Sequence, residues 1–258
     1  MPFLTAPPDD PPRRIVSLVP SLTELLASLG LDEETVGLTR FCMHPAGWKE
    51  RKTIVGGTKN VRVDRVRGLA PDLVIANREE NVREDVEAIA HFAPVLLTDI
   101  ATVDDALHSI REIGAATHRR PQADALAVTL AESFRQLETG EPVRVLYLIW
   151  RDPWMSVGRD TFIADVLRRA GLSSVTEGRT RYPALTDDEI RRLAPEAILL
   201  SSEPYPFAGQ HVAEVQALVP EAQVLLVDGE AFSWYGPRLR ATPGAVRDLR
   251  QRLAPQPS

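Results

Sequence analysis

DRVRGLAPDLVIAN, residues 64–77, reads as a short amphipathic helix, a proline turn and a buried strand. The segment DEIRRLAPEAILLS, residues 188–201, aligns on it without a gap. In each copy the proline halts the helix, and the apolar run after it is short enough for a strand. The two copies predict one equivalent helix–strand unit in each half of the chain, although such junctions also recur by chance in α/β proteins.

Similar apolar segments continue on both sides of these two copies. Most of them are continuously apolar rather than alternating, which is typical of parallel strands covered on both faces. The predicted strands are Arg14–Val19, Val36–Leu38, Leu73–Ala76, Val95–Leu97, Val143–Trp150, Ser174–Thr176, Ala197–Leu200 and Val224–Val227. Helical patterns lie between them at Ser21–Leu29, Asp64–Leu69, Val82–His91, Phe162–Ala170, Asp188–Leu193 and Gly244–Leu253. This alternation predicts an α/β fold.

Two further predicted helices, Val103–Thr117 and Gln122–Leu137, divide the strands into four and four. We therefore predict two lobes, each with a mainly parallel four-stranded sheet flanked by helices, joined by a long linker helix. The predicted boundaries are 1–13 for a disordered N-terminal tail, 14–101 for the N-terminal lobe, 102–140 for the linker helices and 141–258 for the C-terminal lobe. Ligands of open parallel sheets bind beyond the carboxyl ends of the strands, so the loops there form the candidate site.

Composition excludes several classes of function. The 258 residues carry a formal net charge of −6, which argues against the basic surface that nucleic-acid binding needs. Cys42 is the one cysteine, so no intrachain disulfide forms. The apolar runs are far shorter than the ~20 residues of a membrane-spanning helix. The N-terminus MPFLTAPPDDPPRR lacks the features of a signal peptide, so we expect either an intracellular chain or one whose export signal has been removed.

Aromatic side chains gather in the loops that follow the predicted strands. Nine of the fifteen aromatic residues lie there, whereas an apolar core would draw on strands and helix faces. Rigid rings at the strand ends predict a surface for a large, flat, partly apolar ligand. The nine are Phe41, Trp150, Trp154, Tyr182, Tyr205, Phe207, Phe232, Trp234 and Tyr235.

Polar side chains in the same loops are candidates for contacts with the rim of that ligand. Arg40, Arg151 and Arg181 suit anionic groups, because a guanidinium pairs with carboxylates and also stacks on rings. The loop Asn77–Asn81, which includes Glu80, is more polar than a turn requires. Its alternative interpretation is a solvated loop with a helix cap.

Motifs for catalysis and metal binding are absent from the sequence. It contains no G-x-S-x-G, no phosphate loop and no G-x-G-x-x-G after the first strand. Cys42 and His44 lack the partners that a zinc site requires. His44 and His211 lie in predicted loops, so a contact of either with a metal-containing ligand stays open. We predict no catalytic residue, no protein-bound metal and no intrinsic cofactor; an enzyme acting on a metal chelate, such as a chelatase, is an alternative.

The ordered set of segments resembles the helical-backbone (class III) periplasmic substrate-binding proteins of ABC importers, the vitamin B12-binding and ferric-siderophore receptor family. The resemblance covers about residues 14–255 and implies two rigid lobes that hold a corrin or another metal chelate between them. It is carried by RIVSLVPSLTELLASLG at 14–30, VGLTRFCMHP at 36–45, LAPDLVIAN at 69–77, the linker helix, SVGRDTFIADVLRRAGL at 156–172 and RYPALTDDEIRRLAPEAILL at 181–200.

The resemblance implies roles for individual aromatic positions. The family's pocket aromatics map onto Phe41, Trp154 and Tyr182. Asn77 stands where the family has a tryptophan, and another family tryptophan falls near Gly56–Gly57. These two departures leave room for a siderophore or haem in place of a corrin.

The family also carries one acidic residue on each lobe that docks onto arginines of a membrane permease. The matching residues are Asp64 and Asp188, the pair that the internal repeat superposes. An acidic residue at the start of a helix also compensates the helix dipole, so this simpler role stays open.

We therefore expect a non-enzymatic, monomeric solute-binding protein that captures cobalamin or a related metal chelate, such as a siderophore or haem, for an ABC importer. The resemblance implies a periplasmic or cell-surface location. An intracellular carrier or sensor of corrinoid or haem without a permease, and a ferric-siderophore receptor, are the alternatives. The candidate ligand-binding residues are Phe41, Arg40, Asn77, Glu80, Trp150, Arg151, Trp154, Tyr182, Phe207, Phe232, Trp234 and Tyr235.

Overall fold

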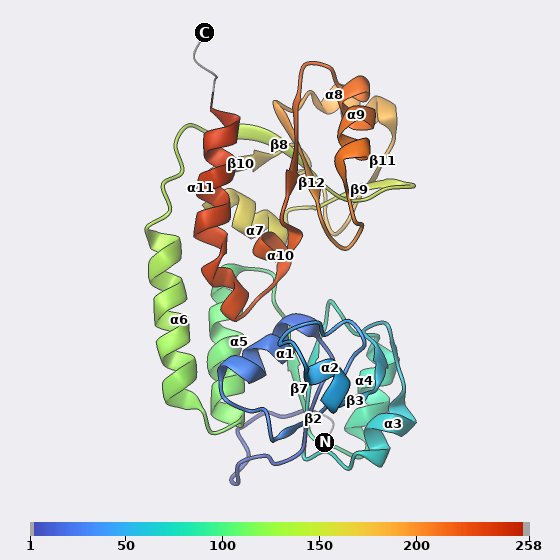
Figure 1. Cartoon of the computed structure of the whole chain (residues 1–258), viewed down its shortest axis with the longest axis vertical. Coiled ribbons are helices and arrows are strands. Elements are labelled where there is room, and N and C mark those ends of the chain that lie inside the picture. Colours follow the sequence, from blue (N-terminus) through green and yellow to red (C-terminus); the bar gives the residue numbers. More distant parts are fainter. Residues whose placement is uncertain (1–2, 255–258) are drawn as a thin grey trace. The chain divides into compact units, whose positions relative to one another are not determined.

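The computed structural model describes residues 3–254 and divides into two compact units (Figure 1). Unit 1 comprises the chain up to Ile100 together with Asp104–Ala131 and Tyr235–Arg238. Unit 2 comprises Ala101–Val103, Glu132–Trp234 and the chain from Leu239 onward. Each unit is built on its own mainly parallel sheet, so the predicted two-lobed α/β fold is confirmed.

The sheet of unit 1 is parallel and has five strands rather than the predicted four, in the order β3-β2-β1-β6-β7. These strands are β1 (Ile15–Ser17), β2 (Thr35–Leu38), β3 (Thr53–Ile54), β6 (Leu73–Asn77) and β7 (Val95–Thr98). Every residue of β1 and β6 is buried, as expected for central strands covered on both faces. A separate antiparallel hairpin joins β4 (Gly56–Gly57) to β5 (Asn60–Val61).

Helices cover both faces of this sheet. Val66 and Val86, from two helices, pack with Val16 on one face, whereas Thr23 Oγ1 on another helix donates to Ser17 Oγ on the opposite face. The helices numbered first are α1 (Pro20–Ser28), α2 (Trp48–Arg51), α3 (Val63–Gly68), α4 (Arg83–Ala90), α5 (Val103–Ala116) and α6 (Arg120–Arg135). The chain passes from unit 1 to unit 2 within α6.

The sheet of unit 2 has six strands around β8, with the order β11-β9-β8-β12-β13 and β10 also paired to β8. The strands are β8 (Val143–Trp150), β9 (Trp154–Ser156), β10 (Leu172–Ser174), β11 (Ala184–Leu185), β12 (Ala197–Ser201) and β13 (Gln223–Val227). β9 pairs antiparallel with both β8 and β11, and the other pairings are parallel.

The side chains of β8 alternate between two helical layers, as a strand's period of two requires. Leu146 and Leu148 pack with Ile190 and Val215 on one face, while the ring of Tyr147 on the other face lies 5.8 Å from that of Phe232. The helices of this unit are α7 (Phe162–Arg169), α8 (Asp187–Leu193), α9 (Gly209–Leu218), α10 (Gly229–Ser233) and α11 (Thr242–Leu253). A 3₁₀ turn at Pro237–Arg240 begins in unit 1 and ends in unit 2.

The two copies of the sequence repeat adopt the same local structure. Helix α3 and strand β6 form the first copy, and α8 and β12 form the second. Ala70 and Ala194, at matching positions after the helices, have φ values of 43° and 45°. Both alanines therefore adopt the left-handed conformation, which at the end of a helix is usually adopted by glycine.

Each copy is joined to the neighbouring strand by the same pair of backbone and side-chain bonds. The Arg14 N–H donates to the carboxylate of Asp72, and the Asp72 N–H donates back to the Arg14 carbonyl. Arg144 and Glu196 repeat both bonds in unit 2. The resemblance between the halves thus includes the contact that fixes the start of the central strands.

Several predicted boundaries need correction. The tail predicted to be disordered over 1–13 lies along unit 1 in its described part, where Leu4 N–H donates to the Val95 carbonyl and Arg13 N–H to Asp72. The region 102–140 is no separate linker, because most of its two helices belong to unit 1. The strand predicted at Ser174–Thr176 ends at Ser174. Helices α2, α9 and α10 and the short strands β3, β4, β5, β9 and β11 were not predicted.

The left-handed backbone conformation of Ala194, at the end of α8, leads to a prediction about stability. We expect Ala194→Gly to raise the free energy of unfolding by about 1 kcal/mol, because glycine removes the Cβ clash of that conformation. The control is Ala164→Gly inside α7, which should lower stability by about 1 kcal/mol. Urea unfolding followed by tryptophan fluorescence measures both, since three of the four tryptophans lie in unit 2. Equal destabilisation by both variants would contradict the prediction.

Candidate functional site

The loop after β2 presents a large exposed aromatic in unit 1. Phe41 is 50% exposed, and the Arg40 guanidinium lies 5.1 Å from its ring centroid. Gly57 of the β4–β5 hairpin packs beneath them: a Cβ there would come within 3.0 Å of the Phe41 ring and 3.1 Å of the Arg40 guanidinium. The hairpin glycine therefore permits the close approach that holds this arginine–aromatic pair in place.

The loop after β6 is built by its own asparagines. The side-chain oxygen of Asn77 accepts from the N–H groups of Glu79 and Glu80, and its Nδ2 donates to Thr98 Oγ1. The Asn77 side chain is fully buried, so it shapes the loop from inside rather than presenting a polar group to a ligand. Glu80 stands in the same loop and is half-buried.

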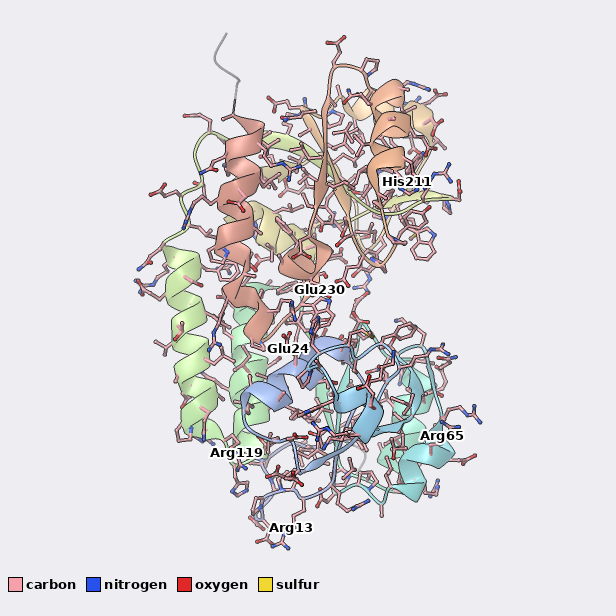
Figure 2. All side chains as sticks on the ribbon, viewed as in Figure 1. Arg13, Glu24, Arg65, Arg119, His211 and Glu230 are labelled. Carbon is pink, nitrogen blue, oxygen red and sulfur yellow. The ribbon has the colours of Figure 1, made fainter. Side chains whose placement is uncertain are left out.

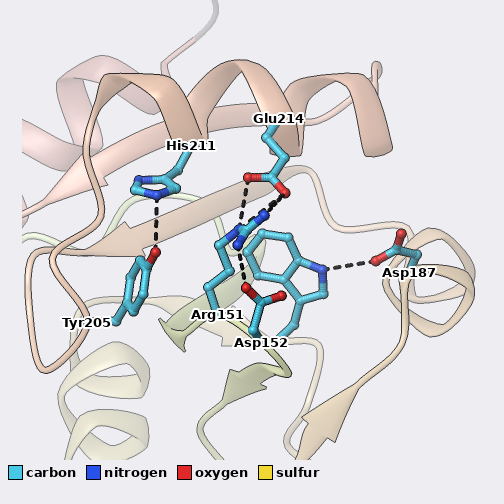
Figure 3. A network of polar contacts seen from close by, with 7 residues as sticks. Arg151, Asp152, Asp187, Tyr205, His211 and Glu214 are labelled. Carbon is cyan, nitrogen blue, oxygen red and sulfur yellow. Dashed lines mark hydrogen bonds and ion pairs between the residues drawn. The ribbon is translucent and has the colours of Figure 1, made fainter.

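The arginine that follows β8 is paired rather than free (Figure 3). Its Nε and Nη2 donate to the carboxylate of Glu214 on α9, and its Nη1 donates to Asp152. The Arg151 guanidinium beside Glu214 holds the pKa of that carboxyl below its usual value. We predicted that Arg151 binds anionic groups of the ligand. In the structure its guanidinium is already paired with two carboxylates of unit 2.

Trp154 is half-buried and held by three side chains of unit 2. Its ring stacks on Phe207 with centroids 6.3 Å apart and planes 10° apart, and the Arg151 guanidinium lies 5.6 Å from its centroid. The indole Nε1 donates to Asp187 at 2.9 Å. A surface cavity of about 360 Å³ adjoins this network. The contacts of Trp154 tie the start of β9 to the start of α8 and to the loop before α9.

An aromatic cluster continues along the loops after β8 and β12. Trp150 is 40% exposed and meets the edge of Tyr205 at 5.7 Å between centroids. The Tyr205 hydroxyl lies 3.3 Å from Nε2 of the buried His211, and Nδ1 of His211 accepts from the Ala208 N–H at 2.9 Å (Figure 3). His211 therefore acts inside unit 2 as the cap of α9.

The remaining predicted aromatics divide by exposure. Phe207, Phe232 and Tyr235 are buried, so their rings belong to the packing of the units rather than to an open surface. Tyr182 and Trp234 are half-buried, and the Arg181 guanidinium lies 5.7 Å from the Tyr182 centroid. Of the predicted rings, Phe41 and Trp150 present the most surface to solvent.

Glu203, which was not among the predicted site residues, lies partly buried directly after β12. Its carboxylate accepts from Ser233 Oγ at 2.6 Å. Burial raises the pKa of Glu203, and the charges of Glu230 and Asp228 raise it further against the hydrogen bonds from Ser233 and Trp234. Its position between a buried strand and Pro204 is the feature of the sequence that could have marked it as a candidate.

The two predicted docking acids lie at the starts of equivalent helices. Asp64 is exposed in the first turn of α3, and Asp188 is exposed in the first turn of α8, where it accepts from Arg191 at 2.7 Å. Glu189, beside Asp188, completes a capping box with Thr186. Both acids thus lie on the surface of their units, Asp188 in an exposed ion pair with Arg191.

Within residues 3–254, no three His, Cys, Asp or Glu side chains form a group that could hold a metal ion. Cys42 is buried and its Sγ contacts the hydroxyls of Thr23 and Thr39, and burial raises the pKa of its thiol. No helix among the described residues combines the length and the apolar character that crossing a bilayer takes.

The capping box of α8 generates a pH prediction. The Thr186 N–H and the Arg179 guanidinium lower the pKa of Glu189 from 4.5 to about 2. Because the folded-state pKa is the lower one, the ionised carboxylate stabilises unit 2 fully above about pH 4.5, and this contribution is lost as the pH falls toward 2. We expect the free energy of unfolding of Glu189→Gln to fall less steeply than that of the wild type over this range.

Urea unfolding at a series of pH values measures the slope. Glu33→Gln, at an exposed position of unit 1, is the control for removal of a carboxylate. Parallel wild-type and Glu189→Gln curves between pH 4.5 and 2 would argue against the assigned role of Glu189.

Comparison with known proteins now gives the family. A family model described as "Periplasmic binding protein" matches residues 15–222. A vitamin B12-binding protein of Pectobacterium carotovorum is 26% identical over 237 residues, covering 88% of this chain and 84% of the relative. An uncharacterized ABC transporter substrate-binding lipoprotein of Bacillus subtilis is 29% identical over 245 residues, covering 88% and 76%.

Solved structures share the fold. The periplasmic vitamin B12 binding protein BtuF of Vibrio cholerae superposes with a TM-score of 0.81 at 20% identity, covering 98% of both chains. A periplasmic heme binding protein of Pseudomonas aeruginosa superposes with a TM-score of 0.82 at 20% identity, covering 96% of this chain and 95% of that one. Since the family model spans most of the sequence, the chain belongs to the periplasmic binding protein family of non-enzymatic solute-binding proteins.

Proposed function

We propose that the chain is the substrate-binding component of an ABC importer and that it captures cobalamin or a closely related corrinoid. The observation that carries the proposal is the exposure of two rings at the carboxyl ends of parallel strands: Phe41 in the loop after β2, and Trp150 as the last residue of β8. Folding normally covers rings of this size, and exposed apolar patches on soluble proteins mark contact surfaces. The loops at the carboxyl edge of each sheet supply the ligand contacts.

The relatives support this class of ligand. The Pectobacterium relative is named for vitamin B12, and the Bacillus relative is named as an ABC transporter substrate-binding lipoprotein. Haem is the second candidate, because a periplasmic heme binding protein shares the fold. A ferric siderophore belongs to the same chemical class, a metal held by an organic chelator with apolar and polar surfaces.

Titration of the purified protein with cyanocobalamin, haem and a ferric siderophore tests the proposal. We expect cyanocobalamin to bind most tightly in isothermal titration calorimetry. Phe41→Ala and Trp150→Ala should each weaken that binding by about 2 kcal/mol, because each removes a rigid aromatic contact. Val128→Ala, at an exposed apolar position on α6, is the matched control and should bind as the wild type does. No binding of cyanocobalamin at high micromolar concentration would exclude the corrinoid.

The surface acids Asp64 and Asp188 form the proposed contact with the permease. They occupy equivalent positions in the two copies of the repeat, and both are exposed. A carboxylate at such a position pairs with a basic side chain of a partner at little desolvation cost.

Charge reversal at these positions tests the docking role. We expect Asp64→Lys and Asp188→Lys to abolish ligand uptake by cells that express the chain with its permease, while calorimetry shows ligand affinity unchanged. Glu33→Lys, an exposed acid of unit 1, should leave both measurements unchanged. Normal uptake by the double variant would show that these two acids are not the contact with the permease.

A further inference from the structure

We infer that His211 positions the exposed ring of Trp150, so that protonation of this imidazole in mild acid weakens ligand binding. Figure 2 labels His211 on α9 of unit 2. The inference rests on the proposed function, since it assigns a control to the surface that Trp150 presents. It is argued from contacts within unit 2 alone.

The imidazole of His211 is hydrogen-bonded through both of its nitrogens. The Ala208 N–H donates to Nδ1 at 2.9 Å, and because a backbone N–H can only donate, Nδ1 carries no proton. In the neutral ring the proton therefore resides on Nε2, which donates to the Tyr205 hydroxyl oxygen at 3.3 Å. The residue is only 8% exposed, so water does not readily replace either bond.

Protonation of this imidazole would remove the acceptor at Nδ1. Both ring nitrogens of an imidazolium are donors, so an Nδ1–H would face the Ala208 N–H. Ala208 is the N-cap of α9, and an alanine side chain offers no acceptor, so the cap depends on His211. A buried donor without an acceptor is costly. Either the ring of His211 or the loop before α9 must then move.

That loop carries the rings that support the ligand surface. The ring of His211 packs edge-on against Tyr205 and Phe207, with centroids 5.4 Å and 5.5 Å away. Tyr205 in turn meets the exposed ring of Trp150 at 5.7 Å between centroids, and Phe207 stacks on Trp154. A displacement of His211 therefore reaches Trp150 through one intervening ring.

The groups around His211 leave the imidazole as the one that responds to mild acid (Figure 3). Glu214, one turn further along α9, favours the imidazolium by its charge, but its carboxylate accepts two bonds from Arg151 at the end of β8. This guanidinium holds the pKa of Glu214 below its usual value and also pairs with Asp152. Between about pH 5 and 7.5, carboxylates and the phenol of a tyrosine ordinarily keep one charge state, whereas imidazole changes its charge.

The pH dependence of ligand binding tests the inference. Cyanocobalamin is a suitable probe, because its own charge does not change in this range. We expect its dissociation constant for the wild type to rise about tenfold from pH 7.5 to about pH 5, as the acceptor for the Ala208 N–H is lost. Isothermal titration calorimetry at both pH values measures the change.

A glutamine separates the charge of His211 from its role as a cap. At the third position of a helix a glutamine side chain accepts from the N-cap N–H, as in a capping box, and it does not titrate. The dissociation constant of His211→Gln should therefore change less than about twofold over the same pH range. His211→Phe keeps a ring but offers no acceptor, so it should bind at pH 7.5 about as weakly as the wild type binds at pH 5.

Two further variants assign the pH dependence to His211. His91→Gln changes an exposed histidine of unit 1 and should retain the pH dependence of the wild type. Glu203, in the loop before α9, has a pKa raised by burial, so its titration has to be separated from that of His211. Glu203→Gln should also retain the pH dependence of the wild type.

Tryptophan fluorescence of the ligand-free protein gives a readout that does not depend on the identity of the ligand. Trp150 contacts Tyr205, and Trp154 stacks on Phe207. The tryptophan emission of the wild type should therefore change between pH 7.5 and about pH 5, and that of His211→Gln should not.

The outcomes separate this inference from the proposed function. If cyanocobalamin binds equally well at both pH values, or if His211→Gln retains the pH dependence, the role assigned to His211 is wrong. If cyanocobalamin binds at neither pH, capture of a corrinoid fails, and the fluorescence change alone decides the role of His211. Circular dichroism at both pH values shows whether a lost affinity is lost folding.

Discussion

The interior backbone of a parallel sheet covered on both faces bonds within the sheet, and its strand starts at the surface are joined by specific side-chain contacts. This chain uses one solution twice. An acidic side chain, Asp72 or Glu196, accepts from the N–H that opens the neighbouring strand, and its own N–H donates back to that residue. This contact fixes where β6 and β12 begin. The two strands run to Asn77 and Ser201, and loops of the candidate site follow them.

Sequence patterns predicted the central elements well because local chemistry defines them. The apolar run of β8 and the helix–proline–strand junctions have their boundaries within a residue or two of the prediction. Helix α9 was not predicted, because its start lacks the Ser, Thr, Asp or Asn that marks an N-cap; a histidine three residues later, His211, supplies the acceptor instead. The return of Tyr235–Arg238 to unit 1 depends on contacts such as the Arg238–Glu24 pair, which no local pattern reveals.

At the candidate site, too, the sequence predicted the types of side chain present but not the partners that they contact. The sequence identified the loops that carry aromatic and charged side chains, since type and position are local. It could not identify which side chains are already engaged, because Arg151 is bonded to Glu214, 63 residues away. Trp154 is likewise held by residues of later elements. Phe41 and Trp150 retain exposed rings, and the proposed ligand surface depends mainly on these two.

Exposed rings alone do not choose among flat metal chelates. Apolar contact scales with the area covered, and a corrin and a porphyrin offer similar faces to an indole or a phenyl ring. The rims of the two ligands differ more, because amide and carboxylate groups differ by a full charge. A site discriminates most strongly through groups that are costly to leave unpaired or to bring beside like charges. Groups at the rim, rather than the flat face, therefore distinguish the two classes of chelate.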